Sequence, residues 1–310
     1  MTSEPRARSD EPGGKLATGV IAAAVTVLIW SLWIVTTRQA ATVHLPVAWL
    51  AMTRFVVPAL ALVPFWWRLG LLPRGVPIHL MAMMVLGAGA PYFALVAAGM
   101  HFASAAESGV LLGGTMPLFA ALFSAAIGRE RFGASRLIGF ALVVIAMAAI
   151  GGAAVVQGQG SGRLLLVVGA ALWAVYTHAY HRSGLAALPA AGIIAAWSTI
   201  VVVPFALMSG SEALLAAGPG VLAGEVLSQG VLSGIVALAC YGTAVRILGS
   251  SRAALLAAVP PAVAAVLAIP MLGEVPSPVA LGGVVLVAAG VALATGAVTL
   301  KPRRAVESGA

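Results

Sequence analysis

Glu107 is the residue in this chain whose surroundings most suggest chemistry. It follows Ser104-Ala-Ala and is otherwise in apolar company, where a carboxylate is costly unless it is paired. By position, its candidate partners are Arg54 and Arg38. Such a pair could bind a zwitterion, because an arginine can donate two parallel hydrogen bonds to a carboxylate. An ion pair at an interface with water is the alternative, and the sequence leaves both open.

His178 and His181 form the second candidate group, three residues apart beside Tyr176 and Arg182. Histidine titrates near neutral pH, so His178 is a predicted proton-coupling residue together with Glu107. Tyrosine and histidine also gather at membrane interfaces, and we assign His181 to such a belt. No carboxylate or cysteine accompanies the pair, so we expect no metal site.

Aromatic side chains with a few hydroxyls suit a small amphipathic ligand. The predicted substrate-binding residues are Trp30, Ser31, Thr37, Arg54, Tyr92, Glu107, Trp173, Tyr176, Trp197 and Tyr241. Trp30 and Trp173 occupy similar places in the two halves of the chain. Ordinary packing or lipid contact is the alternative reading of the aromatic residues, and for Trp33 we prefer it.

Motifs for catalysis are missing from the sequence. It contains no HExxH, no GxSxG and no Walker A motif, and Asp10 is its only aspartate. An intramembrane enzyme would need paired carboxylates, a metal motif or an activated serine, so we expect neither an enzyme nor a cofactor. Without a Walker A motif, we also expect no ATP hydrolysis.

The composition fixes the elements that must position these residues. Hydrophobic residues make up 61% of the chain and charged residues 8%, against about a quarter charged in soluble domains. Apolar runs of about 20 residues span a bilayer as helices. The sequence predicts ten spans, at about 18–38, 47–67, 77–100, 104–127, 134–155, 164–182, 189–208, 224–247, 251–272 and 278–298.

The cationic residues predict the orientation of these spans. One side receives Arg6, Arg8, Lys15, Arg68, Arg74, Arg129, Arg131, Arg136, Arg182, Arg246, Arg252, Lys301, Arg303 and Arg304, and the other side receives Arg38, Arg54 and Arg163. This excess places both termini in the cytoplasm. The net charge of +8 therefore calls for no nucleic-acid partner.

A stretch of the chain occurs twice. Its conserved register is Pro117, Glu130 and Gly139 in the first half and Pro261, Glu274 and Gly283 in the second, each pair 144 residues apart. Chance similarity of two apolar segments is the alternative. A duplication predicts repeats at 16–157 and 158–300. The residues outside them are predicted to form a disordered cytoplasmic tail at 1–15 and a cytoplasmic tail at 301–310. Five helices per repeat would make the repeats inverted, which is a transporter architecture.

The duplicated prolines and glutamates have two readings each. Pro117 and Pro261 lack an N–H and could kink their helices at a cavity, or they could be ordinary prolines that neighbouring helices accommodate. Glu130 and Glu274 lie near predicted helix ends. We favour a structural role in which these carboxylates tether the turn, and coupling at a cavity is the other reading.

The paired arrangement resembles the EamA-like family of the drug/metabolite transporter superfamily. The resemblance rests on Leu272-Gly-Glu274 with the preceding Pro261, on Gly283-Val-Val-Leu-Val-Ala-Ala-Gly290, and on Trp30, Arg54-Phe55 and Tyr241 to Arg246 with Ser251-Arg-Ala-Ala254. It covers about residues 18–298. In the first copy, Ile127-Gly-Arg-Glu130 departs from the usual Leu-Gly-Glu.

The resemblance implies an all-α membrane protein with ten helices in two inverted five-helix repeats. It also implies a secondary transporter for amino acids, other metabolites or drugs, and export is the direction we expect. The expected location is the cell membrane, and the expected partners are the solute, the lipid bilayer and protons as the most economical coupling ion. A homodimer, an intramembrane lipid-modifying enzyme and a non-transporting membrane protein remain open.

Overall fold

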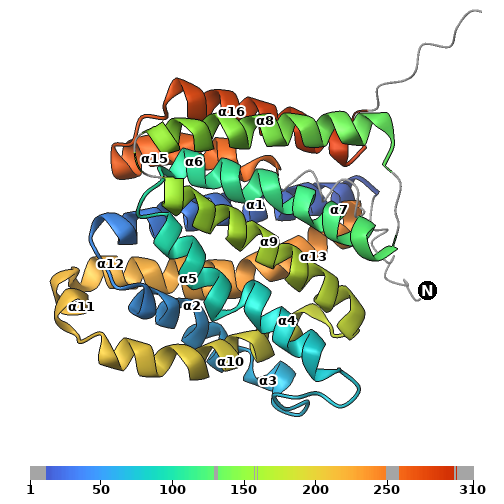
Figure 1. The fold of residues 1–310 in the computed structure, drawn as a ribbon. Coiled ribbons are helices and arrows are strands. Elements are labelled where there is room, and N and C mark those ends of the chain that lie inside the picture. The colour runs from blue at the N-terminus through green and yellow to red at the C-terminus, as the bar shows by residue number, and fades with distance from the viewer. Residues whose placement is uncertain are drawn as a thin grey trace, which may run out of the picture.

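The computed structural model describes residues 12–128, 132–156, 158, 160–248, 258–296 and 298. These residues form helices joined by short connections, and this part of the chain contains no strand. Figure 1 shows most helices running side by side along one direction of the molecule. The prediction of an all-α protein is therefore confirmed.

The helices of the first half are α1 (Pro12–Thr42), α2 (Val47–Ala61), α3 (Val63–Trp66), α4 (Ile78–Ala88), α5 (Ala90–Gly99), α6 (Ala105–Gly109), the π-helix η1 (Val110–Gly114), α7 (Thr115–Gly128) and α8 (Ala134–Val156). Those of the second half are α9 (Gly160–Ser183), α10 (Ala187–Met208), α11 (Glu212–Ala216), α12 (Gly218–Glu225), the π-helix η2 (Val226–Val236), α13 (Ala237–Leu248), α15 (Pro260–Leu272) and α16 (Pro278–Ala294).

Seven helical stretches in the described residues are long and apolar enough to cross a membrane. Three shorter apolar helices, α2, α15 and α16, accompany them. With 13 residues, α15 is about 20 Å long, less than the roughly 30 Å of a hydrocarbon core. The span predicted at 251–272 overlaps α15 from Pro260 to Leu272. Residues 249–257 lie outside the described part.

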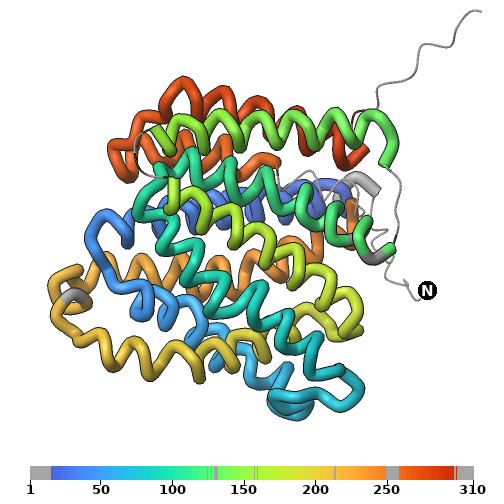
Figure 2. Tube along the Cα trace, in the orientation of Figure 1, coloured from blue at the N-terminus to red at the C-terminus, as the bar shows by residue number. Residues whose placement is uncertain are grey.

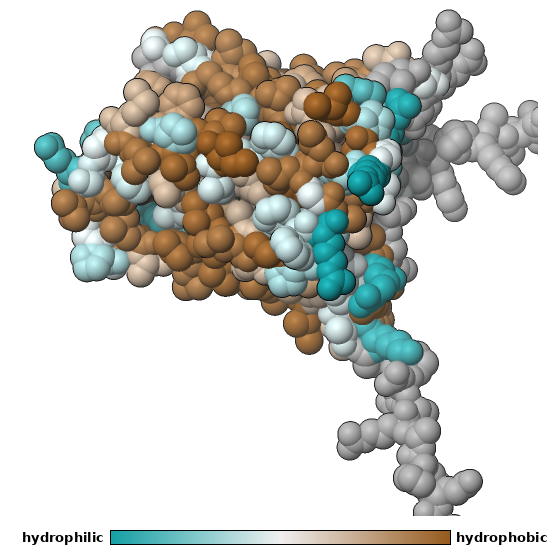
Figure 3. Space-filling view, turned by 90° about the horizontal axis from the view of Figure 1, so that it is seen from below, coloured by the Kyte–Doolittle hydropathy of each residue, from teal (hydrophilic) through white to brown (hydrophobic). Residues whose placement is uncertain are grey.

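The surface of the bundle is apolar over its middle. Leucine and phenylalanine side chains stand largely exposed on it, including Leu60, Phe205 and Leu207. Figure 3 shows this hydrophobic surface with hydrophilic residues gathered at the end that lies to the right in Figure 1. A soluble protein rarely exposes apolar patches of this extent. The chain is therefore a multi-pass membrane protein whose exposed apolar side chains contact lipid.

The two halves pack through pairs of matching helices. α8 packs along α16, and α2 packs along α10, and Figure 2 shows the first of these pairs lying side by side. α1 packs on α13 and α15 of the second half, while α9 packs on α4 and α7 of the first half. Each half therefore makes its main contacts with the other half.

Glycines allow α8 and α16 to approach closely. A Cβ atom added to Gly139 would lie 2.4 Å from the carbonyl oxygen of Gly290, and one added to Gly290 would lie 2.7 Å from the carbonyl oxygen of Gly139. Helices in membranes associate mainly through such close packing of small residues, because lipid is as apolar as their side chains. The backbones of the two helices thus meet directly at this crossing.

The third long helix of each half is irregular. In the first half, Gly89 separates α4 from α5, and the N–H of Ala90 donates to Ser198 Oγ of α10 at 3.0 Å. In the second half, the π-helix η2 separates α12 from α13. Within a membrane, irregular backbone is tolerated where it is buried in protein or lines a cavity, and π-helical turns are frequent at functional sites.

Replacing Ser198 with alanine should lower the stability of the protein by about 1 kcal/mol, because the buried N–H of Ala90 would lose its acceptor. Thermal unfolding of the purified variant measures this effect. Ser209→Ala is the matched control, since that hydroxyl donates to the carbonyl of Phe205 in its own helix at an exposed position. Equal melting temperatures for the two variants would contradict the prediction.

The two duplicated prolines occupy different environments. Pro260 and Pro261 are the first residues of α15, where a missing N–H costs no helical hydrogen bond. Of the two readings, a kink in the interior of a helix does not hold for Pro261 in α15, because this proline lies in the first turn. Pro117 lies in the first turn of α7, directly after the π-helical turn η1, so the irregular segment of that helix falls just before the proline.

Candidate functional site

Arg54 of α2 contacts two other helices. From α2, its Nη1 donates to the main-chain carbonyl of Gln229 in η2 at 3.3 Å, and its guanidinium carbon lies 5.7 Å from the centre of the Trp33 ring in α1. Tyr92 of α5 is buried nearby. No carboxylate pairs with Arg54 in the described part of the chain, which leaves a half-buried cation that an anionic group could bind.

Gln229 connects this cation to a buried carboxylate. Its Nε2 donates to Thr37 Oγ1 of α1 at 2.9 Å and to Glu225 Oε2 at 3.1 Å. Gln229 and Glu225 are almost completely buried. Arg54, Gln229, Thr37 and Glu225, here called the central polar network, thus join α1, α2 and the α12–η2 helix.

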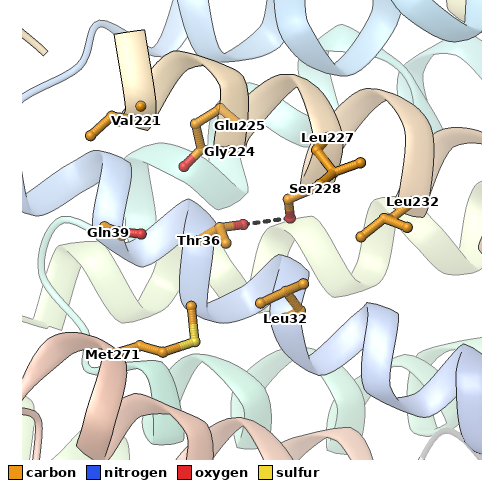
Figure 4. Close-up of a pocket in the computed structure, with 11 residues that line it drawn as sticks. Leu32, Thr36, Gln39, Val221, Gly224, Glu225, Leu227, Ser228, Leu232 and Met271 are labelled. Carbon is orange, nitrogen blue, oxygen red and sulfur yellow. Dashed lines mark hydrogen bonds between the residues drawn. The ribbon is translucent and has the colours of Figure 1, made fainter. Parts of the chain in front are cut away.

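A cavity of about 380 Å³ lies beside this network, between α1 and the α12–η2 helix. Its lining residues are Leu32, Thr36, Gln39, Gly220, Val221, Gly224, Glu225, Leu227, Ser228, Leu232 and Met271. Figure 4 shows the hydrogen bond of 2.8 Å between Thr36 and Ser228 across this space. Mostly apolar walls with a few polar groups are typical of small-molecule sites of about 300–1,000 Å³.

An aromatic series runs beside the network and draws on both halves. The ring centres of Tyr92 and Trp173 lie 5.4 Å apart, and those of Trp173 and Tyr176 lie 4.9 Å apart. Trp30 of α1 and Tyr241 of α13 are also 5.4 Å apart, and Tyr241 lies near Tyr176. The structure therefore brings together five of the six predicted aromatic residues, and Trp197 is the exception.

Two predicted binding residues lie elsewhere. The hydroxyl of Ser31 is buried and donates to the main-chain carbonyls of Val27 and Pro260, at 2.7 and 3.3 Å. It therefore fastens α1 to α15. Trp197 Nε1 donates to the carbonyl of Leu71 at 2.9 Å, which ties α10 to the connection between α3 and α4.

From the sequence we expected Glu107 to pair with Arg54 or Arg38, and this prediction is wrong. Its carboxylate accepts from Nη2 of Arg163 in α9, at 2.9 and 3.1 Å, and from the N–H of Ser104 at 2.9 Å. With the Ser104 side chain, this forms a capping box at the start of α6. Its carboxylate thus joins the start of α6 to the start of α9.

Arg38 instead pairs with Glu274. Arg38 Nε donates to Glu274 Oε1 at 2.7 Å, and its Nη1 donates to the carbonyl of Met100 at 2.6 Å. The other oxygen of Glu274 accepts from the N–H of Ala105 at 2.9 Å, at the beginning of α6. We call Arg38, Glu274, Glu107 and Arg163 the end cluster. It joins α1, α6, α9 and α15 at one end of the bundle.

His178 and Glu130 are the remaining predicted residues. The ring of His178 in α9 packs edge-on against Phe123 of α7, with centres 5.0 Å apart. Glu130 lies outside the described residues. Among the described residues, no group of three or more His, Cys, Asp or Glu side chains could hold a metal ion.

Glu225 and Gln229 are the residues that the sequence analysis missed. They lie four residues apart in an apolar stretch, so they share one face of a helix. A buried carboxylate one turn from a buried carboxamide is a polar pair within a span, and that spacing was the available signal.

Comparison with known proteins supplies the family. One solved crystal structure matches 94% of this chain and 99% of its own chain, with a TM-score of 0.58 and 21% identity, which shows a shared fold alone. No curated protein matches the chain. The family model of the EamA-like transporter family matches residues 17–152 and again residues 160–296. The predicted resemblance is therefore confirmed, and the chain belongs to the EamA-like transporter family, with one copy of its unit in each half.

Proposed function

We propose that this protein is a secondary transporter that exports a small organic solute across the cytoplasmic membrane by alternating access. The observation that carries the proposal is the central polar network beside its cavity. Buried charges and amides inside a membrane are costly and typically mark a substrate or ion pathway. Here Glu225 of the network lines a cavity of about 380 Å³, a volume that accommodates a small molecule.

The exchanged contacts between the halves support two inverted five-helix repeats. The distribution of lysine and arginine supports ten spans with cytoplasmic termini. Arg54 and Ser198 are 144 residues apart, which is the repeat spacing. Arg54 contacts the irregular third helix of the second half through Gln229, and Ser198 contacts that of the first half through Ala90. Equivalent positions thus play exchanged roles, as a twofold axis in the membrane plane would require.

Alternating access supplies a role for the aromatic series. Trp30 and Tyr241 belong to different halves, as do Tyr92 and Trp173. When inverted repeats rock against each other around a fixed site, rings that meet across the two halves separate or close. We propose that these four residues, with Tyr176 and Arg54, contact the solute.

Solute flux into proteoliposomes tests the proposal. We expect time-dependent movement of one or more solutes from a panel of amino acids, nucleosides, sugars and amphipathic cations, faster with an imposed pH gradient. Vesicles whose protein orientation has been determined by protease digestion give the direction of transport. Absence of flux for the whole panel, with measurable turnover of the vesicle lipids, would instead support a lipid-modifying enzyme.

Replacing Trp30 with alanine should reduce transport by roughly tenfold or more, because the variant loses a large aromatic contact and the ring that meets Tyr241 of the other half. Initial rates of flux measure the effect, and thermal unfolding shows whether the variant is folded. Trp67→Ala is the matched control, since Trp67 is exposed beyond the end of α3. Full activity of Trp30→Ala would remove Trp30 from the site.

A further inference from the structure

We propose that Glu225 is the cation site of the cavity, and that a proton and the ammonium group of an organic molecule occupy it in alternation. The proposal rests on the proposed function only in assigning this exchange to transport. The binding of cations by Glu225 is a property of the cavity itself.

The first support is the position of the carboxylate. Glu225 is 2% exposed in the whole protein and lines the cavity. Gln229 Nε2 is the only hydrogen-bond donor that Glu225 has in the described part of the chain. A carboxylate buried with a single amide donor and without a counter-charge is poorly compensated. Binding a cation or a proton would supply the missing compensation.

The charged groups on the helices packed around Glu225 do not compensate the charge of its carboxylate. On α1, Arg38 pairs with Glu274, and Lys15 lies near the opposite end of the helix, about 30 Å along its axis from Thr37. Arg54 of α2 donates to the main-chain carbonyl of Gln229. On α11, Glu212 is exposed and has the same sign as Glu225. η2 contributes amides and hydroxyls, without a charged side chain.

The second support is that Gln229 can serve both states of Glu225. In the observed arrangement, Gln229 Nε2 donates to the carboxylate and to Thr37 Oγ1, whose own hydroxyl donates to the carbonyl of Trp33 at 2.7 Å. Gln229 Oε1 is buried and has no partner among the described residues. If the carboxamide turns over, that oxygen can accept from protonated Glu225 and from Thr37, because an amide carries both donors and acceptors.

The cavity walls indicate which cation would fit. Around Glu225 are the hydroxyls of Thr36 and Ser228, which can accept further ammonium hydrogens, together with apolar side chains such as Leu32 and Met271. An ammonium group on a small apolar body matches this combination. A strongly hydrated inorganic ion would lose its water shell against mostly apolar walls, where little replaces it.

The exchange balances in protons and charge. An organic ammonium approaches protonated Glu225, the carboxyl O–H bond breaks, and the proton passes to water in the cavity. The resulting carboxylate then pairs with the ammonium group. Binding one monovalent cation thus releases one proton, and the reverse step returns it, so the occupied site carries the same net charge in both states.

Isothermal titration calorimetry on the full chain in detergent tests this exchange. The probe is phenethylammonium, and 2-phenylethanol is its neutral match. We expect phenethylammonium to bind more tightly at pH 8 than at pH 6, by as much as about tenfold per pH unit while the carboxyl is protonated. Buffers of different ionisation heat should report up to one proton released per cation bound, and none for 2-phenylethanol.

Matched variants assign the effect to Glu225. Glu225→Gln should weaken phenethylammonium binding by about tenfold or more and remove its pH dependence, while Glu225→Asp should keep proton release. Glu212→Gln replaces an exposed acid just before α12 and should behave as the unaltered protein. Unchanged affinity and proton release in Glu225→Gln would overturn the proposal, as would failure of phenethylammonium to bind the unaltered protein at either pH.

A chemical measurement on the unaltered protein decides the matter if Glu225→Gln does not fold. Dicyclohexylcarbodiimide modifies protonated carboxyls in apolar surroundings, and mass spectrometry locates the adduct. We expect modification of Glu225 at pH 6, less at pH 8, and protection by phenethylammonium; modification that phenethylammonium does not prevent would overturn the cation site. Flux without cation binding would refute this site alone, whereas cation binding without flux of any solute would refute the transport function alone.

Discussion

Gly139→Leu should remove most of the folded protein, because α8 and α16 meet there backbone to backbone. A Cβ atom alone would lie 2.4 Å from the carbonyl oxygen of Gly290, so a leucine can enter only if the helices separate. Overpacking of this kind costs about 1–3 kcal/mol or more, a large share of the roughly 5–15 kcal/mol that stabilises a folded protein. Fluorescence-detected size-exclusion chromatography of the detergent extract measures the yield of monodisperse protein.

Gly152→Leu is the matched control on the same helix. Nothing lies within 4 Å of a Cβ added at Gly152, and leucine favours a helix over glycine by about 0.5–1 kcal/mol. This variant should therefore be as stable as the unaltered protein or slightly more so. If Gly139→Leu has the same yield of monodisperse protein and the same melting temperature as Gly152→Leu, the two helices do not meet as closely as described.

Arg54→Gln should reduce transport of a carboxylate-bearing solute by roughly tenfold to a hundredfold, if such a solute is carried. The guanidinium is a half-buried cation without a carboxylate partner among the described residues, so a substrate carboxylate would be its strongest available partner. Losing a charge-assisted hydrogen bond of about 1.5–3 kcal/mol corresponds to that range. The loss of transport should appear mainly as a higher KM. KM is measured from initial rates of flux in proteoliposomes over a range of solute concentrations.

Two further variants separate binding from folding at this position. Arg54→Lys retains the charge but lacks the fork that holds both oxygens of a carboxylate, so it should recover only part of the activity. Arg68→Gln removes a cation from the exposed connection after α3 and should transport normally. A folded Arg54→Gln protein with unchanged KM and rate would show that Arg54 does not contact the solute.

The membrane class and the family were accessible from the sequence because both rest on long-range regularities. Apolar runs and a spacing of 144 residues survive without any knowledge of which side chains meet. Long runs also located the helices well, and α8 at Ala134–Val156 nearly coincides with the predicted span. The start of α15 was less accessible, since the sequence reading placed Pro260 and Pro261 inside the span predicted at 251–272, whereas they begin α15.

The partners of the charged residues were not accessible. Glu107 lies close in sequence to no cation, and its partner Arg163 is 56 residues away. Sequence order cannot say which connections meet at one end of a bundle. Glu225 was missed for another reason. The predicted span began at 224, which placed the carboxylate at the membrane boundary, whereas the helical stretch extends over Gly218–Leu248 and encloses it.

The duplicated unit is chemically unequal at one position. Subtracting the repeat spacing of 144 from Glu225 leads to Met81, a buried thioether that cannot ionise. A chain with matching copies would have two end states of similar energy, related by symmetry. If the two copies alternate as we propose, charging or neutralising an acid that only one copy carries would favour one of these states over the other. Divergence of the two copies at this residue would then give the proposed cycle a preferred direction.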